Sequence, residues 1–423
     1  MAGRRPVLAP LLLLLLAALL LAGPSPSLQQ QQQQQPISPA DLAALLAVKN
    51  SLTDLPGAAF FSTWDFASPD PCSSFAGLTC SPSGRVSVLS LGAGGLSGSP
   101  GLAGSLSPSL ALLTDLTQLI LSPGIVTGPI PPQLGRLPGL RVLSLTNNRL
   151  TGPIPSSLAA LPGLHTLDLS YNLLTGAIPP GLPALPGLKV LILESNRLSG
   201  RVPPVSAPLL HLDLRKNLLF GGVPRLPPTL RYLSLSGNAM WGPLNGLATL
   251  SELVYLDLSM NRFGGPIPPS LFFTPTLQSM LLQRNNLSGG VPPAAAGPSA
   301  SSYGPGSIVD LSHNALTGEM STVLVGVESL YLNNNRLTGS VPAEYAKSVF
   351  QGRTRTLYLQ HNYISEFPWD RGMAVPDAAA VCLSYNCMAP PVGLEGCPAS
   401  AGTQPSRPAS QCSAFRGGEG PRD

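Results

Sequence analysis

One phrase recurs along this chain: Leu-x-Leu-x-x-Asn-x-Leu-x-Gly-x-Ile-Pro. It is complete at 143–155 (LSLTNNRLTGPIP) and again at 167–179 (LDLSYNLLTGAIP). Its asparagine position returns down most of the sequence, usually after 21 to 24 residues. A fixed period in this range is the signature of a solenoid, in which each repeat stacks on the next. The 423 residues are too many for one ordinary core but suit a fold that grows by stacking.

The asparagine position can be followed through twelve repeats. Two intervals are longer than the others, because small residues are inserted around 99–104 and 292–306. The occupants, in order, are Gly94, Gly124, Asn148, Asn172, Asn196, Asn217, Asn238, Asn261, Asn285, Asn314, Asn335 and Asn362. The pattern is that of a leucine-rich repeat, and it predicts an α/β solenoid with a parallel β-sheet on its concave face.

Each repeated residue has a physical role. Alternate side chains of a strand point to opposite faces, so Leu143 and Leu145 should face the core while Ser144 and Thr146 face the open side. Asn148 is expected to turn inward and to satisfy backbone groups of adjacent turns, because an unpaired buried group costs about 1–3 kcal/mol. The glycine permits a turn, and the proline belongs on the convex side, away from the main ladder.

The N-terminus predicts secretion. Arg4 and Arg5 precede an apolar stretch at 7–22 that small residues follow, which is the composition of a signal peptide. No later segment approaches 18 uninterrupted apolar residues, so we expect no membrane span and a soluble product in the extracellular space. The expected domains are a signal peptide at 1–27, a disordered Gln-rich linker at 28–37, an N-terminal cap at 38–84, the repeats at 85–366, a cysteine-containing C-terminal cap at 367–412 and a disordered tail at 413–423.

The N-terminal cap should begin with a helix. Ser38 is placed to cap free backbone N–H groups, Pro39 suits the first helical position and Asp41 suits the positive helix end. The apolar residues that follow with helical spacing, and that should cover the first repeat, are Leu42, Leu45 and Leu46.

Six cysteines lie outside the repeats, and in a secreted chain they predict disulfide bonds that cap both ends. Cys72 and Cys80 precede the repeats, and their position favours a bond between them. The four that follow the repeats leave three pairings open: Cys382, Cys387, Cys397 and Cys412.

Composition and spacing exclude several classes of function. Only 10% of the residues are charged and the net charge is +4, with no basic run, so nucleic-acid binding is not expected. Paired carboxylates can indicate a glycosidase, but the aspartates here follow the repeat and are interpreted as structural: Asp168, Asp213, Asp257 and Asp310. We find no nucleophile–base pair and no metal-ligand spacing, and therefore predict no enzyme, no metal site and no cofactor.

With its Gly-x-Ile/Val-Pro ending, the repeat resembles the plant-specific leucine-rich-repeat class. The ending occurs eight times, at Gly128, Gly152, Gly176, Gly200, Gly221, Gly265, Gly289 and Gly339. The segment 41–80 resembles the N-terminal cap of plant receptor-like kinases and receptor-like proteins, with Phe75 where that cap usually has Trp. Polygalacturonase inhibitors, a soluble branch, share the repeat. The sequence shows neither the kinase nor the membrane span of the receptor branches, so a soluble member of the family is expected.

Ligand contacts should come from the positions around Leu-x-Leu on the concave face, most of which hold Ser, Thr, Asp or Gly. The exceptions are Arg141, His165, Tyr171, Lys189, Glu194, Arg215, Lys216, Arg231, Tyr232, Tyr255, Gln283, Arg284, His313, Tyr331, Tyr358 and His361. Aromatic and arginine residues are favoured binding anchors, and neighbouring strands lie roughly 4.8 Å apart. We therefore predict a ligand-binding set of Arg215, Lys216, Tyr232, Tyr255 and Arg284.

The resemblance implies a binding role, for which three hypotheses follow. The first is a recognition protein of the plant extracellular space that binds a protein or peptide ligand and supports a receptor kinase in signalling or defence. The second is an inhibitor of a microbial wall-degrading hydrolase, and the third is a structural protein with weak contacts to wall pectin. The sequence also contains an N-glycosylation acceptor, Asn286-Leu287-Ser288, which predicts a glycan on Asn286.

Overall fold

The computed structural model describes residues 35–92, 101–294, 303–368, 375–388, 397–402 and 404–415. The chain divides into two units, 1–35 and 36–423, and every element below belongs to the second unit. The expected signal peptide, most of the Gln-rich linker, Gly94 and the end of the expected tail lie outside the described residues. Within the ranges that are described, no helix has the length and apolar character needed to cross a membrane.

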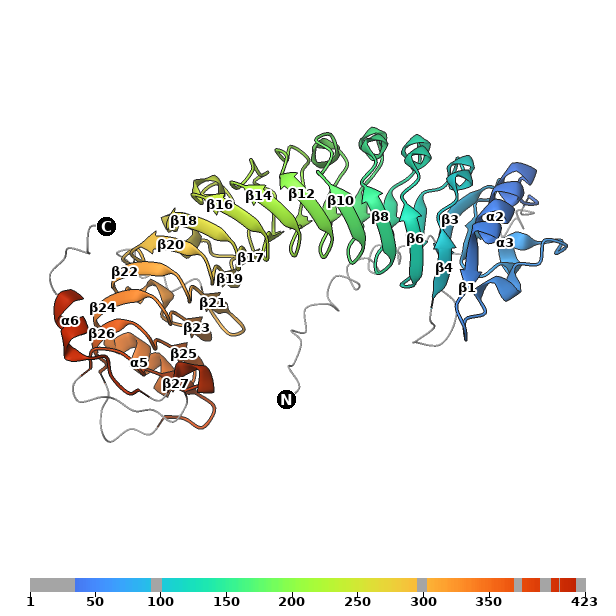
Figure 1. Cartoon of the computed structure of the whole chain (residues 1–423). Coiled ribbons are helices and arrows are strands. Elements are labelled where there is room, and N and C mark those ends of the chain that lie inside the picture. The colour runs from blue at the N-terminus through green and yellow to red at the C-terminus, as the bar shows by residue number, and fades with distance from the viewer. Residues whose placement is uncertain are drawn as a thin grey trace, which may run out of the picture. The chain divides into compact units, whose positions relative to one another are not determined.

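Successive repeats lie side by side and contribute strands to a 14-stranded sheet, called here the first sheet (Figure 1). Its pairings run parallel from β3 onward, while β2 pairs with β3 antiparallel. In order, the strands are β2 (Leu78–Cys80), β3 (Val86–Leu91), β5 (Gln118–Leu121), β7 (Val142–Ser144), β9 (Thr166–Asp168), β11 (Val190–Ile192), β13 (His211–Asp213), β15 (Tyr232–Ser234), β17 (Tyr255–Asp257), β19 (Ser279–Leu281), β21 (Ile308–Asp310), β23 (Ser329–Tyr331), β25 (Thr356–Tyr358) and β27 (Ala380–Cys382). Leu143 and Leu145 are fully buried, as the Leu-x-Leu pattern predicts, and the predicted parallel solenoid is confirmed.

A second sheet of 13 strands accompanies the first, and the sequence did not predict it. Its strands are β1 (Leu52–Asp54), β4 (Leu102–Ser105), β6 (Ile125–Pro129), β8 (Arg149–Pro153), β10 (Leu173–Gly176), β12 (Arg197–Arg201), β14 (Leu218–Gly221), β16 (Ala239–Gly242), β18 (Arg262–Pro266), β20 (Asn286–Gly289), β22 (Ala315–Glu319), β24 (Arg336–Ser340) and β26 (Tyr363–Glu366). The strands follow the repeat asparagine: Leu150 is buried, while Arg149 and Thr151 are exposed. Gly152 has a φ of 77°, a backbone conformation that favours glycine.

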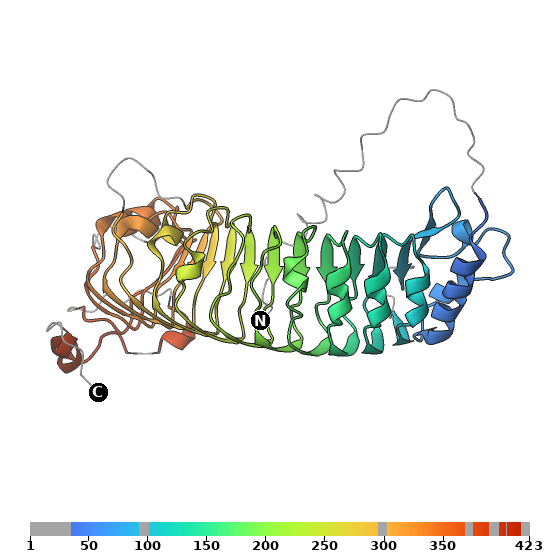
Figure 2. The same ribbon diagram turned by 90° about the horizontal axis from the view of Figure 1, so that it is seen from above.

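Short helical turns return the chain from the second sheet to the next strand of the first, and Figure 2 shows them along one side of the row of strands. They are η3 (Pro108–Leu112), η4 (Pro132–Arg136), η5 (Ser156–Ala160), η6 (Leu182–Ala184), η7 (Asn245–Leu247), α4 (Pro269–Phe272), η8 (Thr322–Leu324) and α5 (Ala343–Phe350). Each places apolar side chains in the core, for example Leu134 and Leu158. The connections at 202–210 and 222–231, in two of the short repeats, contain no helical turn.

The repeat asparagines form a ladder of buried hydrogen bonds. Asn172 Oδ1 accepts from the backbone N–H of Leu150 at 3.0 Å, and its Nδ2 donates to the carbonyl oxygen of Leu145 at 2.8 Å. Asn386, after β27, makes the same contacts with Ile364 and Leu359. The solenoid therefore continues one repeat further than the sequence interpretation placed it, into the segment assigned to the C-terminal cap.

The N-terminal cap consists of α2 (Pro39–Ser51), η2 (Phe60–Thr63) and α3 (Pro71–Ser74). The helix begins where the sequence predicts, and Asp41 lies in its first turn as expected. Asp41 is also fully buried and accepts hydrogen bonds from Arg85 and from the backbone N–H of Val86. Two details of the prediction were wrong. The Ser38 side chain makes no cap hydrogen bond. Leu46 is exposed, because the buried face of α2 is formed by Asp41, Ala44, Leu45 and Val48.

An aromatic cluster and a disulfide bond complete this cap. The ring of Phe75 stacks on that of the buried Trp64, with centroids 5.1 Å apart, so phenylalanine fills the position where tryptophan is usual. Cys72 is bonded to Cys80.

At the C-terminal end, two disulfide bonds settle the open pairings: Cys382–Cys397 and Cys387–Cys412. Two further short helices lie here, η9 (Ala399–Ala401) and α6 (Ala409–Phe415). The Arg407 guanidinium carbon lies 4.0 Å from the ring centroid of Tyr363 and 4.6 Å from that of Tyr385. These contacts hold the last segment against the final repeats.

Candidate binding surface on the first sheet

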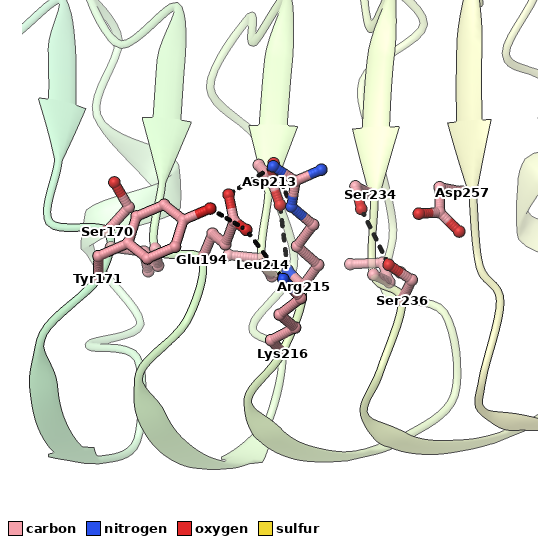
Figure 3. A network of polar contacts seen from close by, with 12 residues as sticks. Ser170, Tyr171, Glu194, Asp213, Leu214, Arg215, Lys216, Ser234, Ser236 and Asp257 are labelled. Carbon is pink, nitrogen blue, oxygen red and sulfur yellow. Dashed lines mark hydrogen bonds and ion pairs between the residues drawn. The ribbon is translucent and has the colours of Figure 1, made fainter. Parts of the chain in front are cut away.

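The outward side chains of β11, β13, β15 and β17 form the candidate site, together with the residues that follow these strands. Because the Leu-x-Leu leucines point into the core, the intervening side chains line up in columns across neighbouring repeats. Two groups stand out: a set of ionic contacts around Glu194, and a row of stacked rings. Figure 3 shows the first group, called here the central network: Tyr171, Glu194, Asp213, Arg215 and Lys216.

Glu194 is the centre of this network and is only 3% exposed. Its Oε1 accepts a hydrogen bond from the Tyr171 hydroxyl at 2.8 Å, and its Oε2 accepts one from Arg215 Nη2 at 2.5 Å (Figure 3). Lys216 Nζ lies 3.8 Å from Oε1. Burial opposes ionisation of Glu194, but the hydrogen bonds from Arg215 and Tyr171 outweigh it and lower the pKa of Glu194. The buried carboxylate is therefore charged and paired.

Arg215 also contacts a second buried carboxylate. Its Nε lies 3.4 Å from Asp213 Oδ2, and its backbone N–H donates to Asp213 Oδ1 at 3.1 Å. Burial raises the pKa of Asp213 to about 7, because the compensation from Arg215 is incomplete. The Arg215 guanidinium group thus lies against two buried carboxyl groups, and these contacts restrict the conformations of its side chain.

Three stacked rings lie beside the network, called here the aromatic row: His211, Tyr232 and Tyr255. They occupy the same register position of β13, β15 and β17. His211 and Tyr232 have centroids 4.0 Å apart and planes within 7°, and Tyr232 and Tyr255 have centroids 4.4 Å apart and planes within 3°. Stacking covers the ring faces, so the half-buried row presents ring edges and hydroxyl groups outward.

Burial sets the ionisation of the row. It lowers the pKa of His211 to about 4, with Arg215 adding to the effect, and it raises the pKa of Tyr255 to about 12. It also raises the pKa of Tyr232. At neutral pH the three rings are uncharged. The hydroxyl groups of Tyr232 and Tyr255 can both donate and accept hydrogen bonds.

The structure brings together four of the five predicted binding residues. Arg215 and Lys216 meet at Glu194, and Tyr232 stacks on Tyr255. Arg284 lies apart, exposed in the turn after β19. Lys216 and Arg284 share the turn position after the strand, where both have positive φ.

The prediction did not include His211, Asp213 or the contact between Tyr171 and Glu194. A signal for the row was present in the sequence. The position before the first leucine of the strand holds rings in three consecutive repeats, whereas its other occupants after β3 are not aromatic: Gln118, Val142, Thr166, Val190, Ser279, Ile308, Ser329, Thr356 and Ala380.

The recurring aspartates lie in the sheet as structural groups. Asp168 Oδ1 accepts from the backbone N–H and the hydroxyl of Ser170, and Asp257 does the same with Ser259. Across the part of the chain that the structure describes, no three His, Cys, Asp or Glu side chains come together to hold a metal ion.

Comparison with known families agrees with this geometry. The family description "Leucine rich repeat" matches residues 136–200, 252–273 and 326–347, and "Leucine rich repeat N-terminal domain" matches 38–81. A crystal structure of PEPR1-AtPEP1 superposes with a TM-score of 0.65 at 27% sequence identity, over 82% of this chain and 52% of that one. The chain therefore carries leucine-rich repeats behind a leucine-rich-repeat N-terminal domain, and its fold is similar to that of plant leucine-rich-repeat ectodomains.

Two further structures place this leucine-rich-repeat protein among its relatives. The ectodomain of the plant membrane receptor kinase GASSHO1/SCHENGEN3 from Arabidopsis thaliana, in complex with CASPARIAN STRIP INTEGRITY FACTOR 2, has a TM-score of 0.67 at 29% identity, over 82% of this chain and 44% of that one. A plant ice-binding protein has a TM-score of 0.52 at 25% identity, over 73% of this chain and 90% of that one. The chain thus spans about half the length of the receptor ectodomains it matches. No curated protein sequence matches it.

Proposed function

We propose that this protein is a secreted recognition protein of the plant extracellular space that binds a protein or peptide ligand on the open face of the first sheet. The observation that carries the proposal is the aromatic row, which stands beside a charged network held at Glu194. The two receptor ectodomains that the chain resembles were crystallised with AtPEP1 and with CASPARIAN STRIP INTEGRITY FACTOR 2. Binding of an extracellular ligand by the same kind of sheet is therefore the function that the geometry favours.

The chemistry of the surface suits a polypeptide ligand. Tyr232 and Tyr255 offer amphipathic edges that combine apolar contact with hydrogen bonding to backbone groups. Lys216, with a side chain that is 66% exposed, and the exposed Arg284 supply cations for acidic groups. Arg215 stays in the proposed binding set, and its contacts with Glu194 and Asp213 also hold it in place beside the aromatic row. We extend the proposal to a receptor kinase as the partner.

A capture experiment with a matched control tests the proposal. The secreted protein is immobilised and exposed to plant extracellular fluid, alongside the combined variant Lys216→Ala/Tyr232→Ala/Tyr255→Ala/Arg284→Ala. Arg215 is retained because its loss would perturb the fold. The control is Tyr331→Ala/Tyr358→Ala, which removes another tyrosine pair from the same sheet, with ring centroids 5.3 Å apart.

We expect a protein or peptide that is retained by the wild type and the control and is lost from the combined variant. Identification of that ligand as a receptor-kinase ectodomain supports the proposed partner, whereas a microbial hydrolase assigns an inhibitory role. Undiminished capture by a folded combined variant contradicts the proposed site.

A further inference from the structure

The second sheet carries an unusual outward position, the residue that directly follows the buried apolar side chain of each strand and in most repeats precedes the glycine. Most repeats fill it with a small polar residue: Thr127, Thr151, Thr175, Ser199, Ser288, Thr317, Thr338 and Ser365. On the adjacent strands β14 and β16 it holds Phe220 and Trp241 instead, which are 45% and 50% exposed. Leu218 on β14 is 61% exposed. We call Leu218, Phe220 and Trp241 the apolar patch.

The folding of the repeats does not require these side chains, because threonine serves in the same position elsewhere. Leu218 and Phe220 are two residues apart on one strand and share a face, and Trp241 lies on the next strand of the same sheet (Figure 1). Each has nearly half of its surface or more open to solvent, so each gives folding only part of the free energy that full burial would supply. Large apolar side chains exposed together on neighbouring strands in this way mark an interaction site.

Arginines border the patch on both sides. Arg201 of β12 pairs in register with Phe220, and Arg262 of β18 pairs in register with Trp241. Both arginines are exposed, as is Arg197 at the start of β12. The residues of β12, β14, β16 and β18, all of which the structure describes, include no Asp or Glu. The patch is therefore an apolar centre with a basic border.

We propose that the apolar patch is a docking site for a second protein partner, one whose contact surface has an apolar centre and acidic groups around it. Tryptophan and arginine are the residue types most enriched among those that dominate binding energy at protein interfaces. A central apolar cluster within a polar rim is the usual anatomy of such an interface. This inference goes beyond the proposed function, because the patch lies on the second sheet and the aromatic row on the first.

Charge argues against a second copy of this chain as the occupant. In a two-fold symmetric dimer the patch would face itself, and the borders formed by Arg201 and Arg262 would meet like charges, which costs several kcal/mol. An acidic partner relieves this repulsion, and its carboxylates can form paired hydrogen bonds with the guanidinium groups. An acidic polysaccharide would use the arginines and the rings, but it would leave the aliphatic Leu218 with no apolar partner.

The test selects ligands directly on the purified secreted chain. A random-peptide display library is panned on the wild type and counter-selected on Phe220→Thr/Trp241→Thr, which installs the residue that other repeats carry at this position and should therefore keep the fold. Selected peptides are then titrated against the wild type, this double variant, Arg201→Glu/Arg262→Glu, and Tyr232→Ala/Tyr255→Ala. Because the chain has three tryptophans, acrylamide quenching is measured in proteins that also carry Trp369→Phe. In that background it follows Trp241, which is half exposed while Trp64 is buried.

We expect selected peptides to combine apolar residues with Asp or Glu and to protect Trp241 from quenching. Their binding should weaken roughly tenfold or more in the double-threonine variant and in the charge-reversed variant, and it should be unchanged by the tyrosine substitutions. Selection of no peptide that depends on Phe220 and Trp241 overturns the proposal. So does binding of polygalacturonate alone through these residues, or self-association of the chain that is lost in the double-threonine variant.

Discussion

Arg215, which follows β13, donates a hydrogen bond at 2.5 Å to Glu194, a residue of the preceding repeat that is only 3% exposed. The pair joins two successive repeats within the candidate site. Replacing Arg215 by alanine would leave Glu194 buried with the Tyr171 hydroxyl and the more distant Lys216. Removing one partner of a buried ion pair leaves the other charge buried and poorly compensated. We therefore expect Arg215→Ala to lower the free energy of unfolding by about 2–4 kcal/mol.

Urea denaturation followed by circular dichroism measures this loss. The neighbouring substitution Lys216→Ala is the matched control, because the Lys216 side chain is 66% exposed and its Nζ lies 3.8 Å from Glu194. It should change the free energy of unfolding by less than about 1 kcal/mol. The double variant Glu194→Gln/Arg215→Gln should lose less free energy of unfolding than the single variants Glu194→Gln and Arg215→Gln lose together. Additive losses would show that the pair is not coupled.

His211 and Asp213 predict opposing effects of pH. The pKa of Asp213 is about 7 in the folded chain, against an ordinary 3.8. Its contribution to stability is therefore present below about pH 4 and is lost as the pH rises to about 7. The pKa of His211 is about 4, against an ordinary 6.5. Its contribution is present above about pH 6.5 and is lost as the pH falls to about 4.

Between pH 4 and 6.5 the two contributions offset each other, and single substitutions should separate them. In Asp213→Asn the free energy of unfolding should rise with pH, with a slope of up to about 1.4 kcal/mol per pH unit relative to the wild type. In His211→Tyr, which keeps a ring in the aromatic row, the slope should change in the opposite direction. The exposed His165 provides the control His165→Tyr, which should follow the wild type. The same slope in all four proteins would contradict this assignment.

The buried asparagine ladder predicts a sharp contrast between two adjacent residues. Asn148 Oδ1 accepts from the backbone N–H of Val126, and its Nδ2 donates to the carbonyl oxygen of Ser122. Asn148→Ala leaves these buried backbone groups without a hydrogen-bond partner, and it should lower the free energy of unfolding by about 2–3 kcal/mol. Asn147 is exposed and has a φ of 54°, so Asn147→Gly should be neutral within about 0.5 kcal/mol. Thermal unfolding of both variants checks the contrast, and equal losses would refute it.

The period of the sequence predicted the first sheet because its signal is chemical and repeated. Leucines at alternate positions and an inward asparagine define the strand and its end in most repeats. The second sheet was missed because its strands contain Gly and Pro, which ordinarily mark turns. Asn386, at the thirteenth repeat position, was missed because it lies between Cys382 and Cys387, which were assigned to the cap, although its Leu-Ser-Tyr-Asn at 383–386 repeats 169–172.

The candidate site was only partly predictable for a different reason. Stacking of repeats places Tyr232 beside Tyr255, so that neighbourhood follows from the period. The period does not say how side chains rotate within a column. That Arg215 turns toward Glu194 and Asp213 depends on the burial of these two acids, which the period does not reveal. The prediction that Arg215 meets a ligand stays a prediction, and the structure adds that its guanidinium group joins two successive repeats.

A last prediction concerns the carbohydrate acceptor. Asn286 begins β20 and is exposed, whereas the adjacent Asn285 faces inward and accepts from the backbone N–H of Phe263 at 2.9 Å. Only Asn286 heads an Asn-x-Ser sequence, and its outward direction makes it accessible to glycosylation in the secretory pathway.

We expect the protein secreted from plant cells to lose mass on glycosidase treatment. Asn286→Gln and Ser288→Ala should each abolish that mass loss while leaving thermal stability near that of the wild type, since neither side chain belongs to the asparagine ladder. A wild-type protein whose mass is unaffected by the enzyme would contradict the assignment.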